Sequence, residues 1–312
     1  MNITFRQLRL FLALADTGSV SRAAKACHVT QPTASMQLKE VTDSVGVPLY
    51  EVIAKRVHLT DAGRELARTA RAMADQWAAF EQGIDATKGL TRGKLRVAVV
   101  STAKYFVPRL LGSFCAKYPE IDISLEVLNR DGVVQRLRDN LDDLSIMSMP
   151  PADMDLDDQV FMPNPLVVIA ASSHPLATQR NIPLDALSSL RFILRERGSG
   201  TRMAIDAHFK RLGFKPNLRL ELGSNEAIRE AVAGELGLSV ISSHALQGQP
   251  GQGVAILDVS GFPIESQWHV VRLKGKQLSP IAKVFQAQLL AQSGQWAGPG
   301  ARPGDEGGGD SD

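Results

Sequence analysis

Two sets of polar residues in this 312-residue chain have the types and spacing needed to bind a partner. The first set follows Thr30, whose hydroxyl can cap a helix that carries Pro32 in its first turn. Apolar residues recur there at helical spacing, at Ala34, Leu38 and Val41. The opposite face is short, polar and free of carboxylates near its start, so it suits the major groove, where side chains read base edges. An ordinary solvated helical hairpin over residues 19–45 is the alternative.

The second set consists of small or hydroxylated residues that follow three predicted strands, each where a helix opens. They are Ser101 and Thr102, Gly198 to Arg202, and Gly223 to Asn225. The carboxyl ends of parallel strands and the free amides of helix N-termini favour anions. Together these residues would bind a small anionic metabolite, such as a phosphorylated one. Each could instead be a simple helix cap, and only their repetition at equivalent points favours a site.

Signatures of enzymes are missing from the sequence. The GSGT run at residues 198–201 lacks the lysine of a phosphate-binding loop, and GxSxG, HExxH and GxGxxG motifs are absent. The six histidines have no companion acid at ligand spacing, and Cys27 and Cys115 lie far apart. We therefore expect neither catalysis nor a bound metal, and two thiols in a reducing compartment; a redox switch is the alternative for the cysteines.

Length and charge indicate two or three compact units with an uneven charge distribution. The net charge is +2, but residues 1–60 hold seven Lys or Arg against four acids. A local basic surface of this kind fits a small nucleic-acid-binding module. The N-terminus lacks the order of a signal peptide, and no apolar run is long enough to span a membrane, so we expect a cytoplasmic protein.

The first 60 residues predict a winged helix-turn-helix. A periodic helix over residues 5–17, with a capping box from Thr4 to Gln7, packs on the two helices of residues 19–45. The segment after Gly46 alternates apolar residues with Lys55, Arg56 and His58, which predicts a two-stranded wing with a basic tip. Contacts from such a tip to phosphates add affinity without sequence choice.

A long helix follows Thr60 and carries a heptad pattern. The apolar positions that we expect to mediate dimerisation are Leu66, Met73, Trp77 and Phe80, and Ala70 and Ile84 belong to the same seam. A helix with one apolar seam, placed directly after a DNA-binding unit, is most simply a dimer linker. Packing against its own domain is the alternative.

From residue 94 the pattern changes to alternating strands and helices, which predicts parallel sheets in two α/β lobes with a cleft between them. We expect the last strand, QWHVVRL, and a helix over residues 280–292 to return to the first lobe. The predicted units are a winged helix-turn-helix domain (1–60), a linker helix and hinge (61–93), a ligand-binding domain (94–293; lobe I 94–164 plus 266–293, lobe II 165–265) and a tail (294–312). The tail has seven glycines and four acids in 19 residues, which predicts disorder.

These parts together resemble the LysR-type transcriptional regulators. The run TQPTASMQL, the motif LTDAG that leads into the dimerising helix, and the two-lobed domain carry the resemblance, which covers residues 2–293. Within that family, STAKYFVPRLLGSF, FILRERGSGTRMA and LELGSNEAIREAVAGELGLSVIS look like the regulators of carbon-fixation (RuBisCO, Calvin cycle) operons.

The resemblance implies a two-lobed effector domain like that of periplasmic binding proteins and a homotetramer, assembled as a dimer of dimers on promoter DNA. It implies that an effector, a phosphorylated metabolite or NADPH, relaxes a DNA bend and permits activation, with no cofactor. The implied DNA-binding residues are Arg22, Thr30, Gln31, Pro32, Thr33, Ser35, Gln37, Lys55 and Arg56. The implied effector-binding residues are Ser101, Thr102, Ser148, Thr201, Arg202 and Asn225. A regulator of another metabolic operon, and a two-lobed solute-binding protein or enzyme, are the alternatives.

Overall fold

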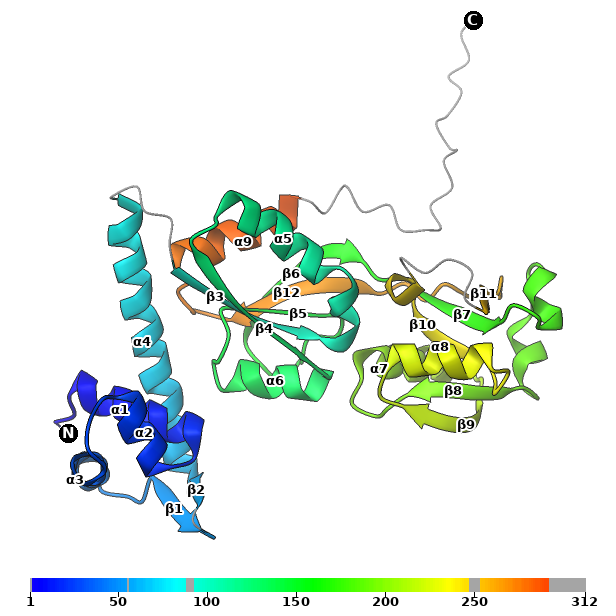
Figure 1. Ribbon diagram of the computed structural model, residues 1–312. Helices are drawn as coiled ribbons and strands as arrows, with labels where there is room; N and C mark the ends of the chain where they lie inside the picture. Colours follow the sequence, from blue (N-terminus) through cyan, green and yellow to red (C-terminus); the bar gives the residue numbers. More distant parts are fainter. Residues whose placement is uncertain (1, 55, 88–92, 247–252, 292–312) are drawn as a thin grey trace, which may run out of the picture.

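The computed structural model describes residues 2–54, 56–87, 93–246 and 253–291. A small helical unit with a wing lies at one end, a long helix leads away from it, and two lobes follow in a row (Figure 1). No helix in these ranges is long and apolar enough to cross a membrane. Lys55, most of the predicted hinge and the tail of residues 294–312 fall outside the described residues.

The N-terminal unit is a winged helix-turn-helix, as predicted. Its elements are α1 (Phe5–Thr17), α2 (Val20–Ala26), α3 (Gln31–Val45), β1 (Tyr50–Ile53) and β2 (Arg56–Leu59). The capping box between Thr4 and Gln7 starts α1, and Gly18, in the left-handed conformation at φ 61°, ends it. Leu10, Phe11, Leu14, Leu38 and Leu49 form the centre of the core. β1 and β2 pair antiparallel.

The heptad pattern lies on the long helix α4 (Asp61–Thr87), and its two halves differ in burial. Thr60 starts the helix, because its hydroxyl accepts a hydrogen bond from the Gly63 amide at 3.1 Å. In the first half, Ala67 and Ala70 are buried and Leu66 packs against the core of the winged unit. In the second half, apolar side chains are 43–58% exposed, namely Met73, Trp77, Phe80 and Ile84. The first half of the apolar seam therefore packs against the winged unit of the same chain. The seam is exposed after about Ala72.

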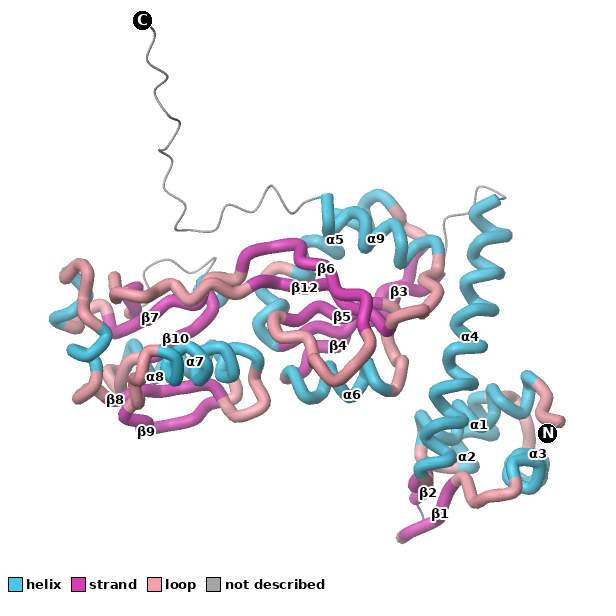
Figure 2. Tube along the Cα trace, turned by 180° about the vertical axis from the view of Figure 1, so that it is seen from behind, coloured by secondary structure: helices cyan, strands magenta, loops and turns pink. Residues whose placement is uncertain are grey.

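Lobe I is a five-stranded sheet between helices. Its elements are β3 (Gly93–Val100), η1 (Ser101–Tyr105), α5 (Val107–Lys117), β4 (Ile121–Leu128), α6 (Arg130–Arg138), β5 (Leu144–Met147), β6 (Leu156–Pro163), β12 (Gln267–Leu273) and α9 (Pro280–Ala291). The strand order is β4-β3-β5-β12-β6, and β12 lies between β5 and β6 (Figure 2). The last strand and helix thus return to lobe I, as expected. β6 was not among the strands predicted from the sequence.

Lobe II differs from the purely parallel sheet that we predicted. Its elements are β7 (Leu166–Ala171), η2 (Pro175–Thr178), η3 (Leu184–Leu187), β8 (Arg191–Arg195), α7 (Gly200–Arg211), β9 (Asn217–Leu222), α8 (Asn225–Ala233), β10 (Ser239–Ser242), η4 (Ser243–Leu246) and β11 (Val254–Ile256). β8 and β9 are parallel, but β7 pairs antiparallel with both β10 and β11. Lobe I has the same irregularity, because β12 is antiparallel to both β5 and β6.

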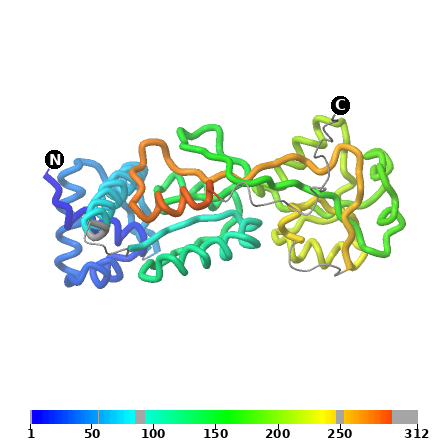
Figure 3. The backbone as a smooth tube through the Cα atoms, turned by 90° about the horizontal axis from the view of Figure 1, so that it is seen from above, coloured from blue at the N-terminus to red at the C-terminus, as the bar shows by residue number. Residues whose placement is uncertain are grey.

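β7 and β12 run antiparallel to their neighbours for the same reason. β12 and β7 are the strands that enter each lobe from the other, so each begins at the boundary where its neighbours end. The crossing segments bond to each other, with the Asn164 amide donating to the Ser266 carbonyl at 2.8 Å, and they run side by side between the lobes (Figure 3). The carboxyl ends of the parallel strands consequently face the boundary from both sides.

Candidate functional site

The outward face of α3 is the candidate DNA interface. Its N-cap is Thr30, whose hydroxyl accepts from the Thr33 amide at 3.4 Å and lies 2.8 Å from the Thr33 hydroxyl. The Gln31 side chain is exposed, and its carbonyl accepts from the Ser21 hydroxyl at 3.0 Å, so α2 holds it in place. Burial of Ala34, Leu38 and Val41 fixes the rotation of α3, so that one side remains open.

The other residues implied in DNA binding surround this face unevenly. Pro32 and Ser35 are exposed, whereas Gln37 is half-buried. In the wing, Arg56 is exposed, and Arg22 is exposed at the start of α2 with its guanidinium donating to the Thr17 carbonyl. Lys55 lies outside the described residues.

Three of the residues implied in effector binding meet at the lobe boundary. Ser101 and Thr102 follow β3 in lobe I, and Asn225 opens α8 in lobe II. The Asn225 amide donates to the Thr102 hydroxyl at 3.2 Å across the boundary. This contact brings together two of the three strand ends that the sequence analysis identified.

Arg195, at the end of β8, connects these groups, and sequence reasoning missed it. Its guanidinium donates to Asn225 Oδ1 at 3.1 Å and to the Ser101 hydroxyl at 3.1 Å, and its side chain is only 2% exposed. Glu196 supplies the opposite charge, with Arg195 Nε at 2.8 Å. An arginine at the carboxyl end of a buried strand was the available signal, because ligands bind at such ends.

Arg202 has a different environment from the one implied. Its guanidinium donates to Asp206 and to Glu221 Oε1, at 2.9 Å in each case, and to the Arg195 carbonyl at 2.8 Å. Burial alone would lower the pKa of Arg202, but the bonds to Glu221 and Asp206 raise it. Arg202 thus fixes α7 against β8 and β9 within lobe II, and Arg195 is the cation turned towards lobe I.

Ser148 of lobe I and Thr201 of lobe II also lie at the lobe boundary. Both are buried, and a Cβ added to Gly200 would lie 3.1 Å from the Ser148 hydroxyl. An open hollow of about 530 Å³ adjoins Ser148 and is lined on its other sides by α7 and by residues 264–267 of the crossing segment. The boundary therefore combines close contacts with an open hollow on the Ser148 side.

A second polar contact crosses the boundary at Glu226, which sequence reasoning also missed. Its carboxylate accepts from the Tyr105 hydroxyl at 2.8 Å and from Lys104 Nζ at 3.1 Å. Burial tends to raise the pKa of Glu226, but the hydrogen bonds from Tyr105, Lys104 and Ser224 lower it to about 2. Burial, followed by the bond to Glu226, raises the pKa of Tyr105. Glu226 is therefore ionised and attracts lobe I to lobe II.

Comparison with known proteins is consistent with this architecture. The family model "Bacterial regulatory helix-turn-helix protein, lysR family" matches residues 5–64, and the family model of the LysR substrate binding domain matches residues 88–294. The HTH-type transcriptional activator CmpR of Synechocystis is 44% identical over 93% of this chain and 96% of its own length. The RuBisCO operon transcriptional regulator of Acidithiobacillus ferrooxidans is 42% identical over 93% and 94%. The CcmR regulatory domain of Synechocystis, solved in complex with 2-PG, matches 65% of this chain and 98% of its own with 50% identity and a TM-score of 0.63.

A winged helix-turn-helix joined by one long helix to a two-lobed ligand-binding domain defines a one-chain transcription regulator. The chain belongs to the LysR family, and it is a DNA-binding regulator rather than an enzyme. Its relatives include regulators of carbon-fixation operons.

Proposed function

We propose that this protein activates a carbon-fixation operon in the cytoplasm, as a dimer of dimers on promoter DNA, in response to a small anionic, phosphorylated metabolite. The bridging position of Arg195 carries the effector part of the proposal. A buried guanidinium that donates to groups of the opposite lobe would exchange those partners for the oxygens of an anion, and phosphate is a preferred partner of arginine.

The surrounding groups suit the same ligand. The hydroxyls of Ser101 and Thr102 accept hydrogen bonds from Arg195 here and could donate to a phosphate instead. Such a ligand would hold the two lobes in one relative position. The related CcmR regulatory domain was solved in complex with 2-PG, an anion of this class, so 2-phosphoglycolate is the natural probe.

The effector is tested by titrating 2-phosphoglycolate, and separately NADPH, into the full-length protein and measuring heat. Arg195→Ala should abolish binding of the phosphorylated probe, whereas Arg197→Ala, the loss of a neighbouring exposed arginine, should not. Binding that survives Arg195→Ala, or that occurs with NADPH alone, would contradict the proposed ligand class.

The DNA-reading role of α3 is tested on operator variants in a footprinting assay. Gln31→Ala should relax sequence preference at one operator position, with a loss of about 1–3 kcal/mol in discrimination. Lys39→Ala, on the same helix, should weaken binding to all sequences alike, because a lysine contacts phosphates. Uniform weakening by Gln31→Ala would show that Gln31 reads no base.

A further inference from the structure

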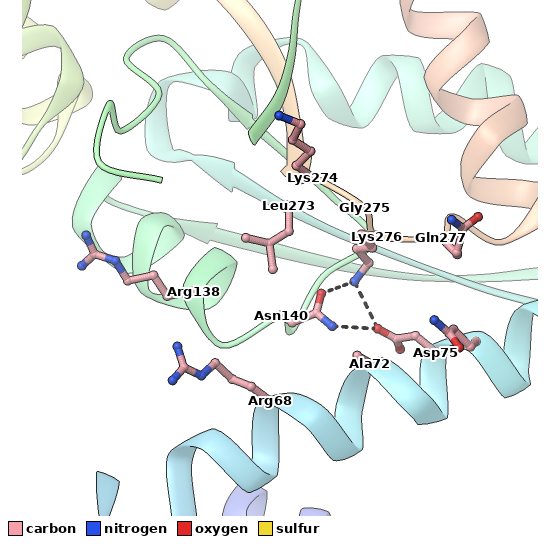
Figure 4. A pocket seen from close by; sticks show the side chains of 11 residues that line it. Arg68, Ala72, Asp75, Arg138, Asn140, Leu273, Lys274, Gly275, Lys276 and Gln277 are labelled. Carbon is pink, nitrogen blue, oxygen red and sulfur yellow. Dashed lines mark hydrogen bonds and ion pairs between the residues drawn. The ribbon is translucent and has the colours of Figure 1, made fainter. Parts of the chain in front are cut away.

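Asp75 joins the linker helix α4 to lobe I through three hydrogen-bond donors. Its carboxylate accepts from Arg96 Nη2 at 2.6 Å, from Lys276 Nζ at 3.1 Å and from Asn140 Nδ2 at 3.3 Å. Figure 4 shows Lys276 and Asn140 pointing from lobe I towards Asp75 on α4. The side chains of Asp75 and Lys276 are only 11% and 6% exposed, so little solvent reaches the ion pair.

Lobe I holds these donors in place by contacts of its own. Asp143 accepts from Arg96 at 2.8 Å, and Lys276 donates to Asn140 Oδ1 and to the Asp142 carbonyl. Burial lowers the pKa of the Lys276 amine, and the charge of Asp75 is the largest influence that raises it again. Loss of Asp75 would leave this buried amine without its counter-charge, which is costly.

Two open hollows lie beside the joint around Asp75. Their volumes are about 230 Å³ and 560 Å³; both are lined by α4 and lobe I, and the larger is lined also by Ala15, Asp16 and Leu59 of the winged unit. Arg71 of α4 adds a second polar contact, because it donates to the Asp139 carbonyl at 3.1 Å and pairs with Asp16 of the winged unit. With these hollows beside the joint, the orientation of α4 on lobe I depends strongly on the polar contacts.

The other end of α4 is fixed to the winged unit. Ala67 belongs to its core, Leu66 packs against that core, and Gly63 packs on the Leu49 carbonyl. The angle at which α4 meets lobe I therefore sets the angle between the DNA-reading helix and the effector domain.

We propose that Asp75 is a positioning residue: its convergence with Arg96, Asn140 and Lys276 locks α4 in one orientation on lobe I, and release of this contact lets the DNA-binding unit reorient. The consequence for DNA rests on the proposed function, since a change of this angle would change the spacing of two half-sites and the bend between them. The lock itself does not depend on that function.

The first test measures the lock without DNA or effector. Spin labels are placed at exposed positions of the two parts, by Lys25→Cys and Lys117→Cys in full-length protein whose natural cysteines are replaced by serine. Asp75→Asn should broaden or shift the distance distribution from pulsed electron spin resonance, and Glu65→Gln, an exposed acid of the same helix, should leave it unchanged. A distribution that Asp75→Asn does not alter would overturn the proposal.

A second variant separates positioning from folding. Asp75→Asn combined with Lys276→Met leaves neither an unpaired buried amine nor an unpaired carboxylate, so it should melt like the wild type and still show the altered distances. Both variants should bind a single half-site with unchanged affinity but lose the wild-type bend on the full operator. Altered distances without any change in bend would support the lock and contradict the proposed consequence for DNA. Restoration of the wild-type distances in the double variant would overturn the lock.

Discussion

Met36 is an apolar side chain on the outward face of α3, the candidate DNA interface. It is 57% exposed, opposite the buried Ala34 and Leu38. An apolar group in the major groove can contact the 5-methyl of thymine, which distinguishes this base from cytosine. Although the resemblance does not include Met36 among the DNA contacts, its position predicts such a contact.

Met36→Ala should lower operator affinity by about 1 kcal/mol, the value of roughly one buried methylene. The contact is identified by replacing each operator thymine with deoxyuridine, which removes the methyl group alone. Wild-type protein should bind more weakly when deoxyuridine replaces thymine at one such position. Met36→Ala should bind the thymine and deoxyuridine operators equally well at that position. Lys39→Ala is the control, because it should bind more weakly yet keep the deoxyuridine effect. An undiminished deoxyuridine effect in Met36→Ala at every position would exclude the contact.

At the scale of elements, the close packing of Gly63 fixes how the start of α4 lies against the winged unit. A Cβ at this position would lie 1.8 Å from the Leu49 carbonyl oxygen, and Leu49 is fully buried. Gly63→Ala should therefore destabilise the winged unit by about 1–3 kcal/mol or more, measured by thermal unfolding. Gly83→Ala, in the same helix with open space around the added Cβ, should instead stabilise by up to about 1 kcal/mol. Equal melting temperatures for the two variants would refute this packing.

We expect the exposed apolar side chains in the second half of α4 to form the dimer contact. Trp77 packs on Phe80 with ring centroids 5.7 Å apart and on Phe5 at 6.1 Å, yet it remains 54% exposed. Burying each such side chain in a dimer contributes about 1.5–3 kcal/mol. Trp77→Lys should shift the protein towards monomer in sedimentation, whereas Glu65→Gln on the same helix should not. Unchanged association of Trp77→Lys would place the dimer contact elsewhere.

Across the molecule, the lobe boundary and the DNA-reading helix lie far apart, with lobe I between them (Figure 1). Lobe I and the contacts of Asp75 and Arg71 with it lie between the boundary and the winged unit. Lys104 and Tyr105 of lobe I clamp the Glu226 carboxylate of lobe II, and the charge of this contact can be titrated.

The clamp should weaken in acid. The pKa of Glu226 is about 2 in the folded protein and near 4.5 without its partners, so its contribution is complete above pH 4.5 and is lost as the pH falls towards 2. Denaturant unfolding at a series of pH values should show wild type more stable than Glu226→Gln at pH 6, with the difference disappearing near pH 2. Because Glu226 is 42% exposed, the difference should be modest. A difference that does not change with pH would contradict ionic clamping.

Elements whose signals lie within a few residues could be predicted from the sequence alone. The capping box at Thr4, the cap at Thr30 with Pro32 behind it, and the alternation of strands and helices predicted the winged unit and two α/β lobes. These features depend on local hydrogen bonds and side-chain periodicity, so they need no knowledge of distant segments. The positions of Ser101, Thr102 and Asn225 at one boundary followed from the same pattern, because parallel strands end at one edge.

Which charges meet became clear only from the folded chain. The position of Arg195 at the end of a strand was visible in the sequence, but its partners in lobe I were not, and the carboxylates that pair with Arg202 were likewise known only from the fold. Asp75 was one polar residue of a heptad helix, although its partner Lys276 lies 201 residues further along the chain. The directions of β7 and β12 likewise depend on the chain crossing between lobes. Long-range ion pairs and strand directions depend on residues that are far apart in the sequence and meet only when the whole chain folds. Local sequence patterns therefore do not predict them.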